Sequence, residues 1–172
     1  MAAINGAEKV VVTDYPDADL IENLAHNIHE SQSLFRPARN IIAQGYLWGS
    51  SVKSLLAHLP PPSHGFDIIL LADLLFNHHC HQDLVSTVLE SMARRPGACA
   101  LVFFTPYRPW LLEKDLAFFD LCRERGLVVQ GIMQKVMDKV MFEEDRGDEL
   151  LRRTVFGYKL LWKDLEERER KS

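Results

Sequence analysis

Short apolar runs alternate with helical patterns along the first two thirds of the chain. Four apolar runs bounded by turn residues predict buried strands, at residues 10–13, 38–44, 66–72 and 99–104. Apolar residues spaced three or four apart predict helices, at residues 20–28, 52–59, 84–92 and 112–119. Strands that alternate with helices in this way predict an α/β domain with a largely parallel sheet.

Local signals mark two helix ends. Asp19, followed three residues later by Glu22, resembles a capping box at the start of the first helix. Gly126 stands just past the last apolar stripe, where a residue with left-handed backbone commonly ends a helix. We therefore expect the first helix to begin near Asp19 and the last to end just before Gly126.

The last third of the chain has a different pattern. Residues 127–140 and 154–162 are both strand-like, and a charged stretch separates them in place of a helix. Such strands must pair antiparallel or lie apart in the sheet. Residues 163–172 are highly charged and have no apolar face, so we expect a frayed, charged tail. The pattern predicts one domain, over residues 1–162.

Composition narrows the class of protein. Of the 172 residues, 47% are apolar and 26% are charged, as in ordinary soluble globular proteins. The formal net charge of -4 gives no global attraction to nucleic acid or to an acidic membrane. Three cysteines at scattered positions form no disulfide framework and favour a reducing compartment. No signal peptide and no membrane-spanning apolar stretch are visible, so we expect a cytoplasmic protein.

Ligands of open α/β sheets bind beyond the carboxyl ends of the strands. Two residues that follow the first two predicted strands are therefore candidates for ligand binding. Asp14 ends the first strand, where its carboxylate can accept hydrogen bonds from ribose hydroxyls or cap the following helix. Trp48 lies between Gly45 and Gly49 after the second strand. Its ring can cover an adenine or a sulfonium cation, or pack on a neighbouring helix.

Further polar and aromatic residues follow the third and fourth strands. Residues 73–77 (Asp-Leu-Leu-Phe-Asn) come directly after an apolar run and indicate a site or a cap. Residues 78–81 (His-His-Cys-His) are of metal-binding types, but adjacent ligands cannot converge on one ion without backbone strain, so no metal site is predicted. Residues 105–110 form an aromatic loop that either shapes an acceptor pocket or packs as a turn.

Five segments together resemble a known family: VVVTDYPD (10–17), GYLWG (45–49), DIILLADLLFNH (67–78), ALVFFTPYRPWLLEKDLAFFD (100–120) and RRTVFGYKLLW (152–162). In this order they resemble a fungal methyltransferase family described as nicotinamide N-methyltransferase-like. Its better-characterised activity is N-terminal and lysine methylation of translation elongation factor 1-alpha. The resemblance implies the class I methyltransferase fold, a Rossmann-like α/β sheet with helices on both faces. It also implies S-adenosyl-L-methionine as the cofactor.

The resemblance assigns the cofactor-binding residues. It implies that Asp14 binds the ribose hydroxyls of S-adenosylmethionine. It likewise implies that Trp48 and the backbone at Ala72 hold the adenine and methionine portions of the cofactor. Asp73 and Phe76 then form a D-x-x-F arrangement, similar to the D-x-x-Y/F motif of related protein methyltransferases, and lie beside the methyl group.

The residues near the methyl group lead to a hypothesis for the acceptor side of the site, where Tyr46, Tyr107 or Trp110 can line the path of the amine. Asp73 and Asn77 are the catalytic candidates, with Asp73 expected to align the acceptor amine. The expected substrate-binding residues are Tyr46, Phe76 and Tyr107. The expected partner is translation elongation factor 1-alpha, and neither nucleic acid nor a membrane is expected as a partner.

One feature of the family is absent from the sequence. The family's first motif is a strand with a glycine-rich turn, upstream of residues 10–17, and this chain begins after it. In the family sheet that strand lies between the strands matching residues 10–13 and 66–72. Its absence would leave unpaired backbone on two strands, at roughly 1–3 kcal/mol for each unsatisfied group. We therefore expect the chain as given to bind the cofactor poorly.

Three other functions stay open from the sequence. One is a small-molecule N-methyltransferase that acts on a nicotinamide-like acceptor. Another is an inactive fragment that acts only as a binding module. A nicotinamide-dinucleotide dehydrogenase is disfavoured because it needs a G-x-G-x-x-G turn, and the sequence contains none.

Overall fold

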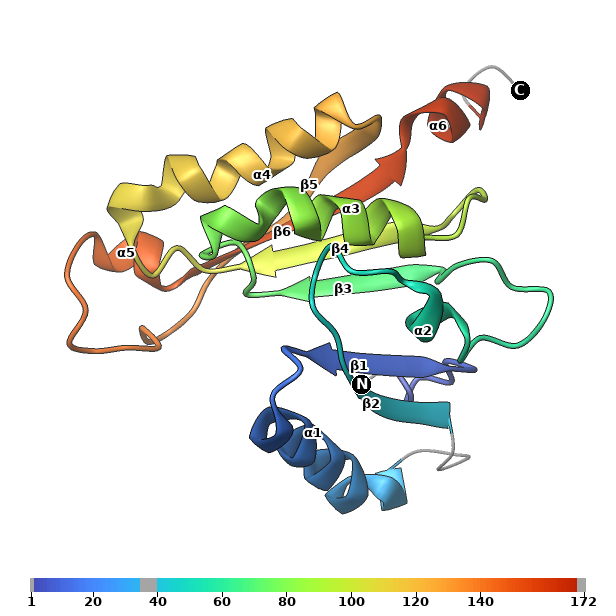
Figure 1. The fold of residues 1–172 in the computed structure, drawn as a ribbon. Coiled ribbons are helices and arrows are strands. Elements are labelled where there is room, and N and C mark those ends of the chain that lie inside the picture. The colour runs from blue at the N-terminus through green and yellow to red at the C-terminus, as the bar shows by residue number, and fades with distance from the viewer. Residues whose placement is uncertain (1, 35–39, 170–172) are drawn as a thin grey trace. The chain divides into compact units, whose positions relative to one another are not determined.

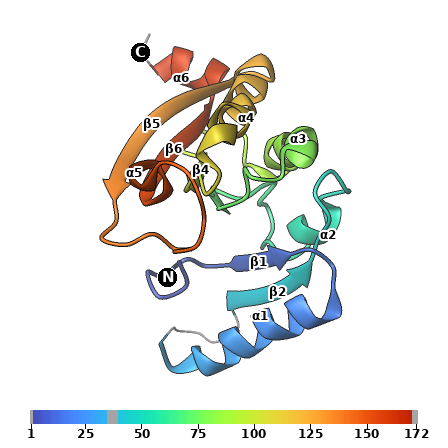
Figure 2. The same cartoon turned by 90° about the vertical axis from the view of Figure 1, so that its left-hand side faces the viewer.

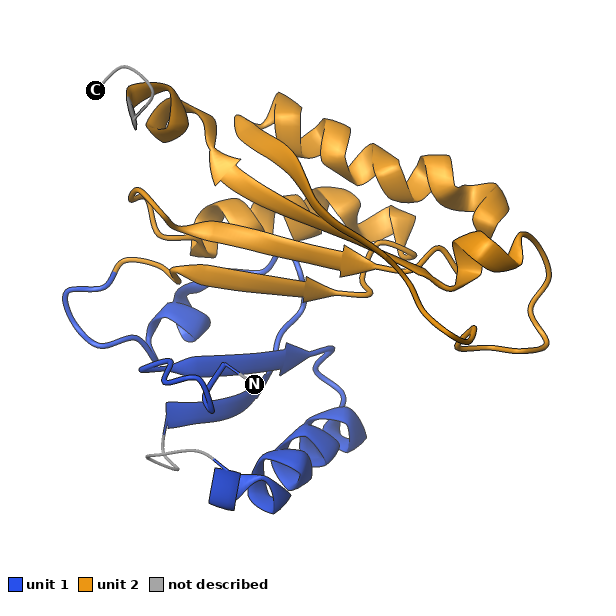
Figure 3. Cartoon of the chain, turned by 180° about the vertical axis from the view of Figure 1, so that it is seen from behind, with its two compact units in different colours: residues 1–63 blue, residues 64–172 orange. Residues whose placement is uncertain are grey.

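A computed structural model describes residues 2–34 and 40–169 of the chain. The chain forms two compact units, Met1–Ser63 (unit 1) and His64–Ser172 (unit 2), which are coloured separately in Figure 3. Residues 38 and 39 of the second predicted strand lie outside the described residues. The single domain expected over residues 1–162 stays a prediction.

Unit 1 contains a two-stranded parallel sheet with a helix packed against it (Figure 1). Its elements are β1 (Val10–Asp14), α1 (Ala18–Glu30), the short 3₁₀ helix η1 (Gln32–Leu34), β2 (Ile41–Gly45) and α2 (Lys53–Leu56). The register pairs Val10 with Ile41 and Asp14 with Gly45. The carboxyl ends of β1 and β2 are therefore level. Asp14 lies beside Gly45, the first residue of the segment 45–49, which we call the Trp48 loop.

Helix α1 begins at a different residue from the one the sequence predicts. The N-cap is Asp17, whose extended backbone precedes the first turn and whose carboxylate accepts hydrogen bonds from the N–H groups of Asp19, at 3.0 Å, and Leu20, at 3.4 Å. Asp19 is thus in the first turn of the helix, and the capping box with Glu22 is wrong. The prediction failed because residues 17 and 19 are both aspartates, and only backbone conformation distinguishes the cap.

Replacing Asp17 with Ala removes this cap. We expect the free energy of unfolding of unit 1 to fall by about 1 kcal/mol, because two N–H groups of the first turn lose their acceptor. Thermal unfolding followed by circular dichroism measures the effect. Asp17→Asn is the control, since its side-chain oxygen still caps the helix. Equal stability of the Ala and Asn variants would contradict the prediction.

Unit 2 contains a four-stranded mixed sheet in the order β3-β4-β6-β5. Its elements are β3 (Ile68–Ala72), η3 (His78–Cys80), α3 (His81–Ser91), β4 (Cys99–Phe104), η4 (Pro109–Leu111), α4 (Leu112–Glu124), β5 (Leu127–Val136), α5 (Glu149–Arg152), β6 (Thr154–Trp162) and α6 (Lys163–Glu169). Strands β3 and β4 are parallel, whereas β6 runs antiparallel to both β4 and β5. Of the two arrangements left open for the last two strands, antiparallel pairing is the one observed.

The core of unit 2 lies between the sheet and the helices α3 and α4, which Figure 2 shows on one side of the strands. Phe104 of β4 stacks on Phe156 and Tyr158 of β6 and contacts Phe119 of α4. Phe118, the preceding residue on α4, is fully buried. The predicted end of α4 is confirmed, because Gly126 follows it with a φ of 86°.

Strands β1 and β3 are less buried than the sequence predicts. No residue of β1 is buried, and Ile68 and Leu70 of β3 are 58% and 57% exposed. Strand β3 is at the edge of its sheet, and Leu71, which follows Leu70, is buried. The continuous apolar runs thus predicted these strands correctly, but the strands are less buried than such runs led us to expect.

The structure corrects two boundaries near the carboxyl terminus. Strand β5 ends at Val136, four residues before the expected end, and residues 163–169 form helix α6 where a frayed tail was expected. An ion pair of 2.9 Å between Arg94 and Asp164 links α6 to the end of α3. None of the described helices is long and apolar enough to cross a membrane.

Candidate functional site

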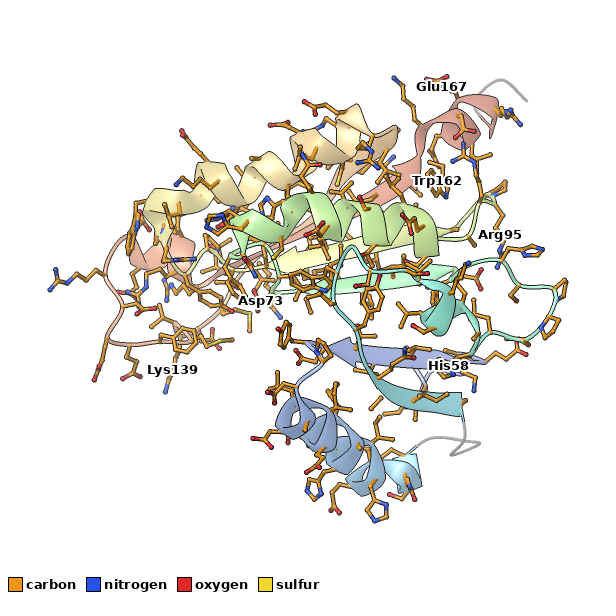
Figure 4. All side chains as sticks on the ribbon, viewed as in Figure 1. His58, Asp73, Arg95, Lys139, Trp162 and Glu167 are labelled. Carbon is orange, nitrogen blue, oxygen red and sulfur yellow. The ribbon has the colours of Figure 1, made fainter. Side chains whose placement is uncertain are left out.

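Asp73 directly follows β3 and has an unusual backbone conformation (Figure 4). Its φ of 54° lies in the left-handed region, which is strained for most residues other than glycine. The Asp73 carboxylate accepts a hydrogen bond of 2.9 Å from the N–H of Thr105, and its N–H donates to Phe103 at 2.8 Å. Contacts with the neighbouring strand therefore hold a strained residue, a combination found often at functional sites.

Tyr107 adjoins this carboxylate. Burial, a hydrogen bond to Asp73 and the negative charge of Asp73 raise the pKa of the Tyr107 phenol above its ordinary value. The hydroxyl also lies 3.6 Å from the sulfur of Met141, a weaker acceptor. The Tyr107 ring meets the Phe142 ring edge to face at 5.3 Å. Tyr107 thus stays protonated at neutral pH and can donate a hydrogen bond to Asp73.

The segment after Asp73 presents one aromatic side chain to solvent. Leu75 is fully buried and anchors the segment, whereas Phe76 is 51% exposed. The carbonyl of Leu75 accepts a hydrogen bond of 2.8 Å from Nε2 of His81, and the carbonyl of Phe76 accepts one of 3.1 Å from the Arg108 guanidinium. Two consecutive carbonyls on either side of the Phe76 Cα are therefore fixed by side chains from other elements.

Asn77 and Ala72 complete the candidate residues of unit 2. Asn77 precedes η3, and its carbonyl accepts the N–H of Cys80 at 3.0 Å. Ala72 is the last residue of β3 and is exposed, in register with Phe103 of β4. The structure thus brings Ala72, Asp73, Phe76, Asn77 and Tyr107 to the carboxyl ends of β3 and β4, as the sequence predicts for residues that follow these strands.

The histidines after Asn77 contact protein groups. His78 Nε2 lies 2.6 Å from an oxygen of the buried Asp115, and His81 packs edge to face on Phe118. Burial raises the pKa of the Asp115 carboxyl, while the neighbouring His78 and Arg108 lower it. Burial lowers the pKa of His81. Among the residues that the structure describes, no three histidine, cysteine or acidic side chains are grouped to hold a metal ion.

The remaining candidates lie in unit 1. Asp14 is exposed at the end of β1, and its Oδ1 accepts a hydrogen bond of 2.7 Å from the N–H of Tyr15. The Asp14 carbonyl accepts the N–H of Tyr46 at 2.9 Å, which ties the start of the Trp48 loop to the end of β1. An exposed carboxylate in this position fits the predicted role of accepting hydrogen bonds from ribose hydroxyls.

The Trp48 loop contains one buried and one partly exposed aromatic residue. Tyr46 is buried, and its hydroxyl donates a hydrogen bond of 2.6 Å to the Ser50 carbonyl. Trp48 is half-buried in a turn closed by the Ser50 N–H and the Leu47 carbonyl, and Gly49 supplies the positive φ of 80° that the turn requires. Trp48 is therefore better placed than Tyr46 to meet a ligand.

Sequence reasoning singled out the loop of residues 105–110 but not its part in supporting the site in unit 2, and it did not single out Asp115. Thr105, Arg108 and Asp115 all hold the segment after β3 but belong to other elements. The one signal available in the sequence was Asp115, an acidic residue one position before the apolar Leu116 of the α4 stripe. A buried carboxylate needs a partner, so this position indicated a polar contact inside the protein.

Comparison with known proteins identifies close relatives. The family model described as lysine methyltransferase matches residues 1–125. A protein N-terminal and lysine N-methyltransferase of Aspergillus fumigatus is 44% identical over 162 residues, which are 94% of this chain and 62% of that protein. A protein of the same description from Neurospora crassa is 47% identical and is matched over 60% of its length, by 94% of this chain. The chain thus spans less than two thirds of these relatives.

Comparison with solved structures shows the fold alone. A predicted O-methyltransferase of Agrobacterium tumefaciens matches with a TM-score of 0.54 at 12% identity, over 92% of this chain and 65% of that one. Fibrillarin of Aeropyrum pernix, solved with S-adenosyl-L-methionine, matches with a TM-score of 0.51 at 14% identity, over 87% and 55% of the two chains. The predicted Rossmann-like α/β methyltransferase fold is confirmed, and the chain belongs to the lysine methyltransferase family.

Proposed function

We propose that this protein transfers a methyl group from S-adenosyl-L-methionine to protein amines. The proposed acceptors are the N-terminal amine and the adjacent lysine of translation elongation factor 1-alpha, encountered in the cytoplasm. The observation that carries the proposal is the strained Asp73, whose carboxylate is oriented by Thr105 and Tyr107 at the end of β3. The relatives described as protein N-terminal and lysine N-methyltransferases support the choice of acceptor.

The residues at the strand ends of each unit suit parts of the cofactor. The exposed Asp14 carboxylate suits the ribose hydroxyls, and the half-buried Trp48 suits the adenine ring or the sulfonium. The exposed Ala72 leaves its backbone accessible to the methionine portion. When bound, the cofactor supplies an electrophilic methyl group on a positively charged sulfur.

The chain's own residues contribute positioning and desolvation more than acid–base chemistry. The acceptor nitrogen must be neutral, with its lone pair directed at the methyl carbon. Asp73 accepts a hydrogen bond from the amine N–H and fixes its direction, while Tyr107 and Thr105 keep the carboxylate from rotating. Asn77 offers a second polar group beside the amine, and the exposed ring of Phe76 packs on the acceptor chain.

The two proposed acceptors differ in their pH dependence. An α-amine has a pKa of about 7.7–8.0 and a lysine a pKa of about 10.4, so the α-amine is neutral at much lower pH. We expect methylation of an α-amine acceptor to rise roughly tenfold per unit below about pH 7.5 and to level off above about pH 8. Methylation of a lysine-only peptide should still be rising at about pH 9. Initial rates with matched peptides test this, and identical profiles would contradict it.

Methyl-acceptor assays with radiolabelled S-adenosylmethionine test the proposed function. The protein is incubated with elongation factor 1-alpha, with the same factor blocked by N-terminal acetylation, and with nicotinamide. Label in the unblocked factor and reduced label in the blocked one support the proposal. Label in nicotinamide alone would show a small-molecule methyltransferase. No transfer, together with binding of the factor, would show a binding module.

A further inference from the structure

A charged cluster around the buried Asp115 holds the residues that follow Asp73. We call Asp115, His78, His81 and Arg108 the Asp115 cluster. Asp115 lies on α4 and is 6% exposed, His78 and His81 begin η3 and α3, and Arg108 precedes η4. His78, Arg108 and His81 are the ionisable groups whose charges act on Asp115. Of these three, His78 contacts the Asp115 carboxylate directly, whereas Arg108 and His81 act on it through their charges.

The contacts of the cluster converge on three consecutive residues. His81 donates to the carbonyl of Leu75 at 2.8 Å, and Arg108 donates to the carbonyl of Phe76 at 3.1 Å. His78 follows Asn77 directly and is held by Asp115 at 2.6 Å. The two histidine rings meet edge to face at 5.5 Å, so the position of one constrains the other. His81 and Arg108 thus bind the backbone of residues 75–77, and His78 directly follows it.

Stability alone is a weak reason for such a cluster. A buried ion pair often contributes little, because removing two charges from water costs about as much as their attraction returns. Apolar residues of similar size commonly stabilise a core as well or better. A network of directed hydrogen bonds does, however, fix the orientation of the backbone that it binds. The Phe76 carbonyl is bound in this way, while the Phe76 side chain is 51% exposed.

We propose that Asp115 is a positioning residue, which acts through His78 and together with Arg108 holds Phe76 and Asn77 in place for the methyl acceptor. This inference rests on the proposed function, because it assigns the held residues to acceptor binding. The fixed carbonyls hold the backbone on both sides of the exposed Phe76, and Asn77 follows it directly. Loss of the cluster lets the segment move, so acceptor alignment suffers while cofactor affinity does not.

Four variants of the full chain test the inference. Asp115→Leu removes the charge and the acceptor, and Asp115→Asn keeps an acceptor oxygen for His78. Arg108→Met removes one hydrogen bond from an exposed side chain and carries little risk to folding. Asp120→Leu is the matched control, because Asp120 lies on the same helix and pairs only with exposed Arg123.

The first measurement compares kcat/KM for the acceptor with the Kd for S-adenosylmethionine. We expect Asp115→Leu and Arg108→Met to lower kcat/KM about tenfold, since small misplacements of reacting groups cost this much or more. Asp115→Asn should recover most of the loss. The Kd should stay within about twofold of wild type in every variant, and Asp120→Leu should match wild type. An equal loss of cofactor affinity, or no rescue by Asn, would overturn the inference.

The second measurement does not depend on activity. In ¹H–¹⁵N spectra of the chain, Asp115→Leu and Arg108→Met should move the amide resonances of Phe76 and Asn77, while Asp120→Leu leaves them in place. If wild type transfers no methyl group, the proposed function fails and these spectra alone decide the positioning role. If Asp115→Leu does not fold, Arg108→Met decides it. Unmoved resonances in Arg108→Met overturn the inference.

Discussion

Replacing Asp73 with Ala lowers methyl transfer by about 100-fold or more, because the acceptor amine loses the group that aligns it. The Asp73 carboxylate is held by the Thr105 N–H at 2.9 Å, so it is oriented before any acceptor arrives. The loss should appear in kcat/KM for the acceptor peptide, measured with radiolabelled S-adenosylmethionine.

Asp73→Asn separates the charge of the side chain from its geometry. Asn also adopts left-handed backbone readily, and its amide oxygen can accept the Thr105 N–H. We expect this variant to fold like wild type and to lose about tenfold in kcat/KM, since the negative charge is gone but the alignment remains. Full turnover in Asp73→Ala, with cofactor affinity intact by calorimetry, would refute the role of Asp73.

Phe118→Ala is expected to have the largest effect on stability. Phe118 is completely buried on α4 and contacts the rings of His81 and Phe119, each at a centroid distance of 5.5 Å. Deleting a buried aromatic ring costs about 3–5 kcal/mol, from lost transfer free energy and from the cavity that remains. A typical domain is stable by only about 5–15 kcal/mol, so unit 2 should unfold at much lower urea concentration.

The matched control for this substitution is Phe142→Ala. Phe142 is 50% exposed and makes one ring contact, with Tyr107. We expect it to change the free energy of unfolding by less than about 1 kcal/mol. Urea unfolding in a Trp48→Phe background, in which Trp110 and Trp162 are the remaining fluorescent tryptophans, reports on unit 2. Comparable losses in the two variants would show that burial on α4 is not what stabilises this unit.

The order of the elements was predictable because apolar periodicity distinguishes strands from helices. Strand β6 has the bounds that the sequence predicts, residues 154–162, since its apolar run, which includes the buried Leu160, is flanked by charged segments. Strand β5 was predicted too long. Its apolar pattern continues past Val136 through Met137 and Val140, but all residues from 131 to 139 are exposed. Periodicity cannot say whether an apolar residue is covered.

The candidate site was predictable only in part. Asp73, Asn77 and Tyr107 follow strands, so their positions at the carboxyl ends came from the pattern alone. The partners that orient them did not, because the Thr105 N–H reaches Asp73 only through the pairing of β3 with β4. Which strands lie next to each other depends on the packing of the whole sheet, so a local sequence pattern does not predict it.

The backbone conformation of Asp73 limits which substitutions the fold can accept at this position of the site. Single base changes in an aspartate codon reach Asn, His, Tyr, Ala, Val, Gly and Glu. At a φ of 54°, Gly and Asn adopt the backbone readily, whereas β-branched Val is strained there. A lineage that abandoned methyl transfer would therefore keep its fold most easily through Asn or Gly. We therefore expect Asn or Gly at position 73 in a descendant that no longer transfers methyl groups.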